Sequence, residues 1–222
     1  MAVGLVTVSL LVVLGREGRG REVLAAQAGL LLSLAAGAFA SARSAGSTRR
    51  VRELLLAGAP FVLAGPAAYL VLGGRALEAS CLVVLSVAAL VLSAGPGLFL
   101  CRVLGSPLAA QLLVGLLVAS LLWAPLGLSS LLAALDEPGR QACIRGILAF
   151  HPLGGASDLL GVDWLRGGET YRRSAMGSLY FFRYPPWAFC AGVQALTGLP
   201  LLLLALLRIR GEPGVPSREG GL

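Results

Sequence analysis

Long apolar stretches separated by short polar ones dominate the chain. A helix that crosses a membrane needs about 20 consecutive apolar residues, with a usual range of about 17–25. By this criterion the pattern predicts six spans, the first of them short, at residues 2–15, 23–42, 54–73, 79–100, 108–135 and 187–207. We therefore expect an all-α, polytopic helix bundle that is integral to a membrane.

Small residues and prolines add detail to these spans. Gly29, Ser33 and Gly37 recur every four residues in the second span, so they share one helix face and favour close packing against another helix. The fifth span, residues 108–135, is long enough to tilt or to break at Pro125. The pattern thus predicts tightly packed helices with one irregular span.

The segment 136–186 differs from the rest of the chain because it is richer in aromatic and charged residues. It is too long for a structureless connection, and arginine beside tyrosine and tryptophan is typical of a membrane interface. We interpret it as an interfacial or partly re-entrant helical segment, with candidate residues Phe150, His151, Pro152, Asp158, Asp163 and Trp164. The tail 208–222 is rich in glycine, proline and charge, and we expect it to be disordered.

Composition supports the membrane assignment and narrows the chemistry. With 57% hydrophobic and 13% charged residues, the chain is far too apolar for a soluble domain. All of its 18 basic residues are arginines, and a Walker A loop needs a lysine, so the chain does not hydrolyse ATP through such a loop. No basic run is interleaved with aromatics, which argues against nucleic-acid binding. The predicted spans contain no Asp or Glu, which argues against a proton-coupled carrier or an ion pump.

Few residues could carry catalysis. His151 is the only histidine, which excludes a multi-histidine metal site within one chain. Asp158 and Asp163 are five residues apart, a spacing that does not by itself bring two carboxylates together. We expect no catalytic residue, no metal and no cofactor, although an intramembrane enzyme using His151 with either aspartate remains an alternative. The four cysteines are typical of small buried residues, and a Cys143–Cys190 disulfide would require an oxidising compartment.

The connection after the second span is the most informative segment. Residues 42–60 read ARSAGSTRRVRELLLAGAP, a short basic segment that runs into the third span. Two spans followed by this connector resemble the ABC-2 class of ABC-transporter permeases, in which a charged residue, Gly-Thr, a leucine stretch and a proline follow one another. The residues in similar places are Arg43, Gly46, Thr48, Glu53, Leu54, Leu55, Leu56 and Pro60. Two departures make the match degenerate: Ser47 is inserted between the glycine and the threonine, and no acidic residue precedes Arg43.

The resemblance extends to the six-span layout and to the long segment before the last span. In that family the segment is extracytoplasmic and partly re-entrant, and Phe150-His151-Pro152-Leu153 stands where relatives often carry a similar aromatic/Asn-Pro-Leu start. The amphipathic cytoplasmic helix at the N-terminus of the family is missing here, because the first span begins at Met1. We therefore expect either a start site upstream of Met1 or a shortened homologue.

The resemblance implies a function. Residues 1–207 would form a permease-like domain in a bacterial cytoplasmic (inner) membrane, dimeric with a second permease subunit of the same or another kind. A separate ABC ATPase subunit would supply the energy for export and would contact the connector at Arg43, Thr48, Arg49, Arg50, Arg52 and Glu53. The alternative is a non-catalytic scaffold or accessory subunit of a membrane complex. The arginines of the predicted loops do not settle which side faces the cytoplasm, and the sequence does not identify a substrate.

Overall fold

The computed structural model describes residues 20–43, 48–165 and 182–211, and every regular element in these ranges is a helix. The helices are α2 (Arg21–Arg43), α3 (Thr48–Val71), α4 (Ala76–Leu104), α5 (Pro107–Gly127), α6 (Ser129–Ala134), α7 (Glu137–Phe150), α8 (Pro152–Leu160) and α11 (Trp187–Gly211). Among them, four are long and apolar enough to cross a membrane: α2, α4, α5 and α11. The described part of the chain is therefore an all-helical bundle of the kind found in integral membrane proteins.

The predicted number of six spans is not confirmed, because four helices qualify in the ranges described. The predicted span 2–15 lies outside those ranges. The predicted span 54–73 lies largely within α3, in which the described residues Gly58–Val71 form a shorter apolar helical stretch. The helix continues through Pro60 and Pro66 without a break.

The fifth span and the tail also differ from the prediction. The segment 108–135 is divided into α5 and α6, and the chain leaves the α5 helix at Leu128, after it has passed through Pro125. The span was predicted to tilt or to break at Pro125; the helix ends close to this proline, which itself lies inside α5. Of the predicted tail, residues 208–211 belong to α11, and the remainder lies outside the described ranges.

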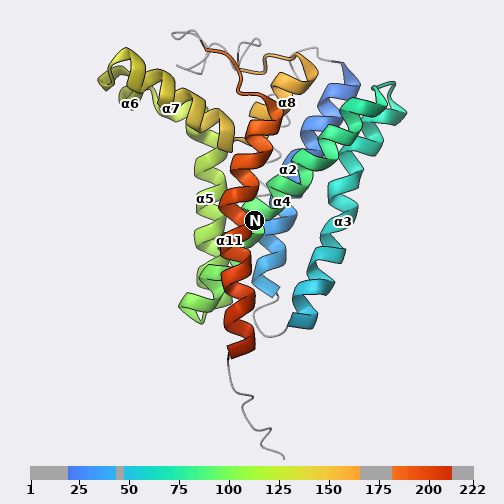
Figure 1. Cartoon of the computed structure of the whole chain (residues 1–222), viewed down its shortest axis with the longest axis vertical. Coiled ribbons are helices and arrows are strands. Elements are labelled where there is room, and N and C mark those ends of the chain that lie inside the picture. The colour runs from blue at the N-terminus through green and yellow to red at the C-terminus, as the bar shows by residue number, and fades with distance from the viewer. Residues whose placement is uncertain (1–19, 44–47, 166–181, 212–222) are drawn as a thin grey trace, which may run out of the picture.

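The helices alternate in direction (Figure 1). In this view α2, α4 and α11 run from top to bottom, whereas α3 and α5 run from bottom to top. The central helix is α4, which packs most extensively against α2 and α11 and is the most buried of the four candidate spans. The upper end carries α6, α7 and α8, and we name it the α8 end. The lower end carries the last residues of α2, the first of α3, the turn between α4 and α5, and the end of α11, and we name it the connector end.

The predicted packing face of the second span is confirmed by its contacts. A Cβ atom on Gly65 of α3 would lie 2.6 Å from the Cα atom of Gly29, so the two helices cross almost backbone to backbone. One turn later, the Ser33 hydroxyl lies 3.2 Å from the Phe61 carbonyl oxygen and donates to it. Gly37 faces α4, where an added Cβ would lie 3.1 Å from the Ala94 nitrogen. Small residues therefore bring α2 against both neighbours, as expected where backbones approach closely in a membrane.

Candidate functional site

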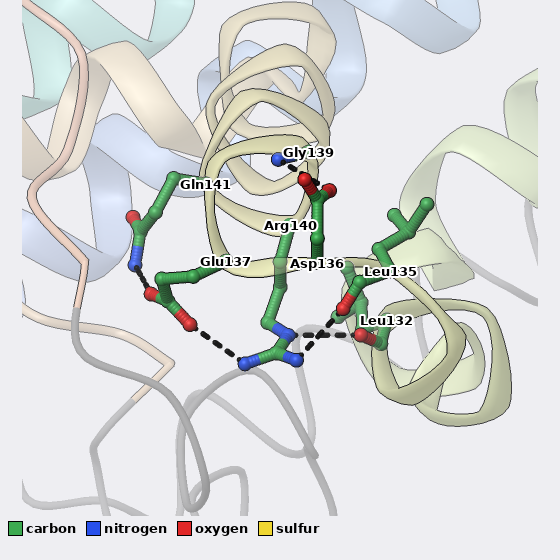
Figure 2. A network of polar contacts seen from close by, with 7 residues as sticks. All are labelled: Leu132, Leu135, Asp136, Glu137, Gly139, Arg140 and Gln141. Carbon is green, nitrogen blue, oxygen red and sulfur yellow. Dashed lines mark hydrogen bonds and ion pairs between the residues drawn. The ribbon is translucent and has the colours of Figure 1, made fainter.

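The α8 end is organised by a polar corner between α6 and α7 (Figure 2). The Arg140 side chain donates through Nε to the Leu132 carbonyl oxygen at 2.9 Å and through Nη2 to that of Leu135 at 2.8 Å. Carbonyl groups at a helix C-terminus have no donor within their own helix, so the guanidinium satisfies the end of α6. It also forms an ion pair of 2.7 Å with Glu137, while Asp136 caps α7 by accepting from the Gly139 backbone N–H. Arg140 thereby holds α6 folded back from the start of α7.

His151 is the junction between α7 and α8 and is fully buried. Its Nδ1 accepts from the Leu153 backbone N–H at 3.1 Å, and therefore the neutral ring carries its proton on Nε2. That nitrogen faces the Leu122 carbonyl oxygen of α5 at 3.4 Å and donates to it. The ring stacks on Trp164 with centroids 4.8 Å apart. Burial lowers the pKa of His151 from 6.5 to about 4, so the ring is uncharged near neutral pH.

The two aspartates bind other partners than His151. Asp158 accepts a hydrogen bond from the Trp187 backbone N–H at 2.9 Å and so fixes the start of α11 against α8. Asp163 accepts from the Tyr184 hydroxyl at 2.6 Å, and the same hydroxyl accepts from the Leu165 N–H at 3.2 Å. Burial, and next the hydrogen bond to Asp163, raise the pKa of Tyr184 well above its ordinary value. These contacts make the aspartates anchors of the chain around α8, and they give His151 no acid–base partner.

The first half of α8, which begins at Pro152, is buried among the longer helices. A Cβ atom on Gly154 would lie 2.9 Å from the Leu148 carbonyl carbon, and one on Gly155 would lie 2.8 Å from Leu85 of α4. The obstacle at Gly154 is the backbone of α7, which cannot move aside, whereas the obstacle at Gly155 is the end of the Leu85 side chain. In Figure 1 the segment lies at the α8 end of the bundle, where α8 contacts α2, α4, α7 and α11.

Some contributors to this site were not singled out from the sequence. The Gln194 side chain of α11 donates through Nε2 to the Ala149 carbonyl oxygen at 3.2 Å, with that of Phe150 at 3.5 Å. The available signal was a lone, long polar side chain inside an apolar span, which needs a partner there. For Arg140 the signal was Asp136 with Pro138 two residues later, a pattern that marks a helix start and so places the arginine near the first turn.

Phe150 lines an apolar, partly open cavity of about 210 Å³. The cavity lies between α2, α4, α5 and α11, and its walls are Leu34, Leu92, Ser93, Pro96, Val114, Leu117, Val118, Leu121, Phe150 and Thr197. Two hydroxyl groups are the only side-chain polar atoms in this wall, and both donate to backbone carbonyls: Ser93 to Leu34 at 2.7 Å and Thr197 to Val193 at 2.8 Å.

The predicted ATPase-contact residues lie at the opposite end from this corner (Figure 1). Arg43 is the last residue of α2 and Thr48 the first of α3. Arg49, Arg50, Arg52 and Glu53 follow within the first two turns of α3, so this part of the predicted connector is helical. The contacts of these side chains lie outside what the structure describes.

The chain offers no metal or disulfide chemistry in the ranges described. No group of three His, Cys, Asp or Glu side chains gathers there in a way that could hold a metal ion. Cys81, Cys101, Cys143 and Cys190 are all free thiols, so the Cys143–Cys190 disulfide is not formed. Compared with protein-family models, curated proteins and solved structures, the chain matches none of them.

Proposed function

We propose that the chain is the membrane subunit of an ABC-type exporter, working as a dimer and driven by a separate ATPase subunit. The observation that supports this most is the distribution of segments between the two ends of the bundle (Figure 1). The end of α2 and the start of α3 share the connector end with the α4–α5 turn and the end of α11. The α6–α8 segment occupies the other end. The resemblance to ABC-2 permeases implies this same division, with a cytoplasmic connector and an extracytoplasmic segment before the last span.

Among the described residues the connector end is the more basic of the two, as the proposed orientation requires. Within the described residues, the arginines of the connector end are Arg43, Arg49, Arg50, Arg52, Arg102, Arg208 and Arg210, with Glu53 as the acid there. Those of the α8 end are Arg21, Arg75, Arg140, Arg145 and Arg183, accompanied by Glu22, Glu78, Asp136, Glu137, Asp158 and Asp163. Positively charged residues close to span ends favour the cytoplasmic side. In the proposed orientation the connector end faces the cytoplasm, where an ATPase would meet it; Arg16, Arg19, Arg166, Arg172, Arg173 and Arg218 lie outside the described residues.

The packing of α2 provides a route for mechanical coupling. A force applied where α2 meets α3 acts on a helix that crosses α3 at Gly29 and Gly65 and contacts α4 at Gly37. The hydrogen bond from Ser93 of α4 to the Leu34 carbonyl of α2 ties the two helices at the level of the cavity. Because close-packed helices shift as rigid units rather than deform, movement of the connector would be carried into the centre of the bundle.

The test is a set of arginine variants assayed with an ATPase encoded beside this chain. The triple variant Arg49→Ala/Arg50→Ala/Arg52→Ala should insert normally but lose co-purification with the ATPase, and the stimulated ATPase rate in proteoliposomes should fall at least five-fold. A matched control removes three exposed arginines of the α8 end, Arg75→Ala/Arg145→Ala/Arg183→Ala, and should retain both properties.

Two results would count against the proposal. Equal effects of the two triple variants would mean that the connector has no special part in binding the ATPase. Failure of the wild-type protein to bind or stimulate any ATPase, with normal insertion and folding, would favour the scaffold alternative.

A further inference from the structure

The apolar cavity exists because small side chains adjoin a close helix crossing. Gly95 of α4 and Gly198 of α11 meet backbone to backbone, since a Cβ on Gly95 would lie 2.9 Å from the Gly198 carbonyl carbon. Pro96 and Thr197, the immediate neighbours of these glycines, line the cavity together with Ser93. None of these side chains reaches across the space toward α5. The hollow is thus built into the described fold by residue size.

The cavity lies at the level of the bilayer centre. Leu117 is the midpoint of the candidate span Pro107–Gly127, and Thr197 is the midpoint of the candidate span Trp187–Leu207. Both line the cavity, so its depth corresponds to the hydrocarbon centre of the membrane. At this depth the bundle is surrounded by the terminal halves of the lipid acyl chains.

The walls favour hydrocarbon over water. A buried water needs two to four polar partners, and an apolar cavity of about 150 Å³ stays dry and takes up small apolar molecules. The hydrogens of both hydroxyl groups in the wall are already donated to backbone carbonyls, and the remaining wall side chains are apolar. A space of about 210 Å³ with this lining is suited to several methylene groups of a linear chain.

The cavity is also accessible from the lipid side. It is partly open rather than sealed, and Leu117 in its wall is 56% exposed on the outer surface of α5. Both α5 and α11 pack on α4, and the cavity lies between α5 and α11. A lipid chain can therefore enter sideways, without passing the polar corner at the α8 end.

We propose that this cavity binds one acyl chain of a bilayer phospholipid, inserted between α5 and α11 with its terminal half against Val114, Val118 and Thr197. Phe150 closes the cavity on the side of α8, where Gln194 holds its backbone. This site needs only the membrane-spanning orientation of the helices and does not depend on coupling to an ATPase.

The experiment uses the full-length protein in vesicles that contain a phosphatidylcholine with a photoreactive diazirine in one acyl chain. After irradiation, labelled peptides are mapped by mass spectrometry. A diazirine in the terminal half of the chain should label the peptides around Val118 and Thr197, whereas one near the headgroup should not. Excess unlabelled phosphatidylcholine should compete for this labelling.

Matched variants separate a site from the general lipid surface. Val118→Phe fills the cavity and should reduce labelling of its walls at least five-fold. Leu117→Trp, at the exposed mouth, should do the same and is the variant to rely on if Val118→Phe does not fold. Leu116→Trp is the control, because Leu116 is 63% exposed on the neighbouring face of α5 and does not line the cavity.

Three outcomes would overturn the proposal. Labelling spread evenly over the exposed leucines of α5 would indicate ordinary lipid contact without a site. Unchanged labelling in both cavity variants would exclude occupancy of the cavity. Cross-linking of the cavity walls to a second copy of the chain, in place of lipid, would make this face a protein interface.

Discussion

Replacing Gly198 by alanine tests whether α4 and α11 are held together by backbone contact. An added Cβ would lie 2.6 Å from the Val91 carbonyl carbon and 2.9 Å from the Leu92 nitrogen, whereas ordinary contact begins at 3.4 Å. The obstructing atoms are backbone, so they cannot rotate away as a flexible side chain would. The Val91 carbonyl oxygen lies closer still, so the helices must separate by more than 0.8 Å, the difference between 2.6 Å and 3.4 Å, along one of the most extensive contacts of α4.

The same helix supplies a matched control, Gly192→Ala, because nothing lies within 4 Å of a Cβ at Gly192. Both substitutions bring the same gain in helix propensity, about 1 kcal/mol at most. Their difference therefore isolates the steric cost, which for overpacking in a well-packed interior is about 1–3 kcal/mol. We expect Gly198→Ala to be less stable than Gly192→Ala by that amount.

The assay is reversible unfolding of the purified protein in mixed micelles with increasing mole fraction of sodium dodecyl sulfate, followed by circular dichroism or tryptophan fluorescence. Equal unfolding midpoints for the two variants would refute the backbone-contact argument. A second substitution on the partner helix, Gly95→Ala, should reproduce the destabilisation, since its Cβ would lie 2.9 Å from the Gly198 carbonyl carbon.

The remaining predictions concern three polar residues at the α8 end. Because the pKa of His151 is lowered from 6.5 to about 4, protonation favours the unfolded chain, and the free energy of unfolding should be constant above pH 6.5 and fall by about 3 kcal/mol between pH 6.5 and 4. The His151→Asn variant should lack this part of the pH dependence, and superimposable pH profiles of the two proteins would contradict the assignment. Arg140→Ala should lower the free energy of unfolding by about 1–3 kcal/mol and speed hydrogen exchange in α6. Arg140→Lys should restore little of this stability, because an ammonium group lacks the fork that reaches two carbonyls. Arg145→Ala, at an exposed position, should leave stability unchanged. Asp158→Ala should cost about 0.5–2 kcal/mol through loss of the acceptor at the start of α11, measured by unfolding and by exchange of the Trp187 amide.

The sequence pattern predicted correctly those features that depend on residues close together in the chain. The last span was expected to begin at Trp187, and α11 does begin there. Two prolines precede it, and they disfavour helical backbone in the residues before them. The face containing Gly29, Ser33 and Gly37 was visible as a four-residue repeat, because small residues along one helix face report close approach whatever the partner is. Hydropathy likewise located the centres of α2 and α4.

Long-range contacts determined what the pattern could not show. The end of α5 depends on Arg140, which binds the carbonyls of Leu132 and Leu135 and so draws α6 away from the line of α5. Pro60 and Pro66 in α3 and Pro125 in α5 remove one backbone donor each but leave the backbone helical. His151 was recognised as the one histidine, yet its role depends on Leu122 and Trp164, which no spacing in the sequence pairs with it.

The glycine crossing and the cavity are two consequences of one arrangement on α4 and α11. Gly95 and Gly198 set the distance between the two helices, and the residues beside them, Pro96 and Thr197, form part of the cavity wall. A larger side chain at either glycine would move both walls at once, so a change at the crossing also changes the cavity. The hydrogen bond from Ser93 to the Leu34 carbonyl fixes the third wall, on α2, at the same level. If α2 shifts when its connector end is pushed, this bond carries the shift into the cavity wall, and the width of the apolar space then depends on the position of α2.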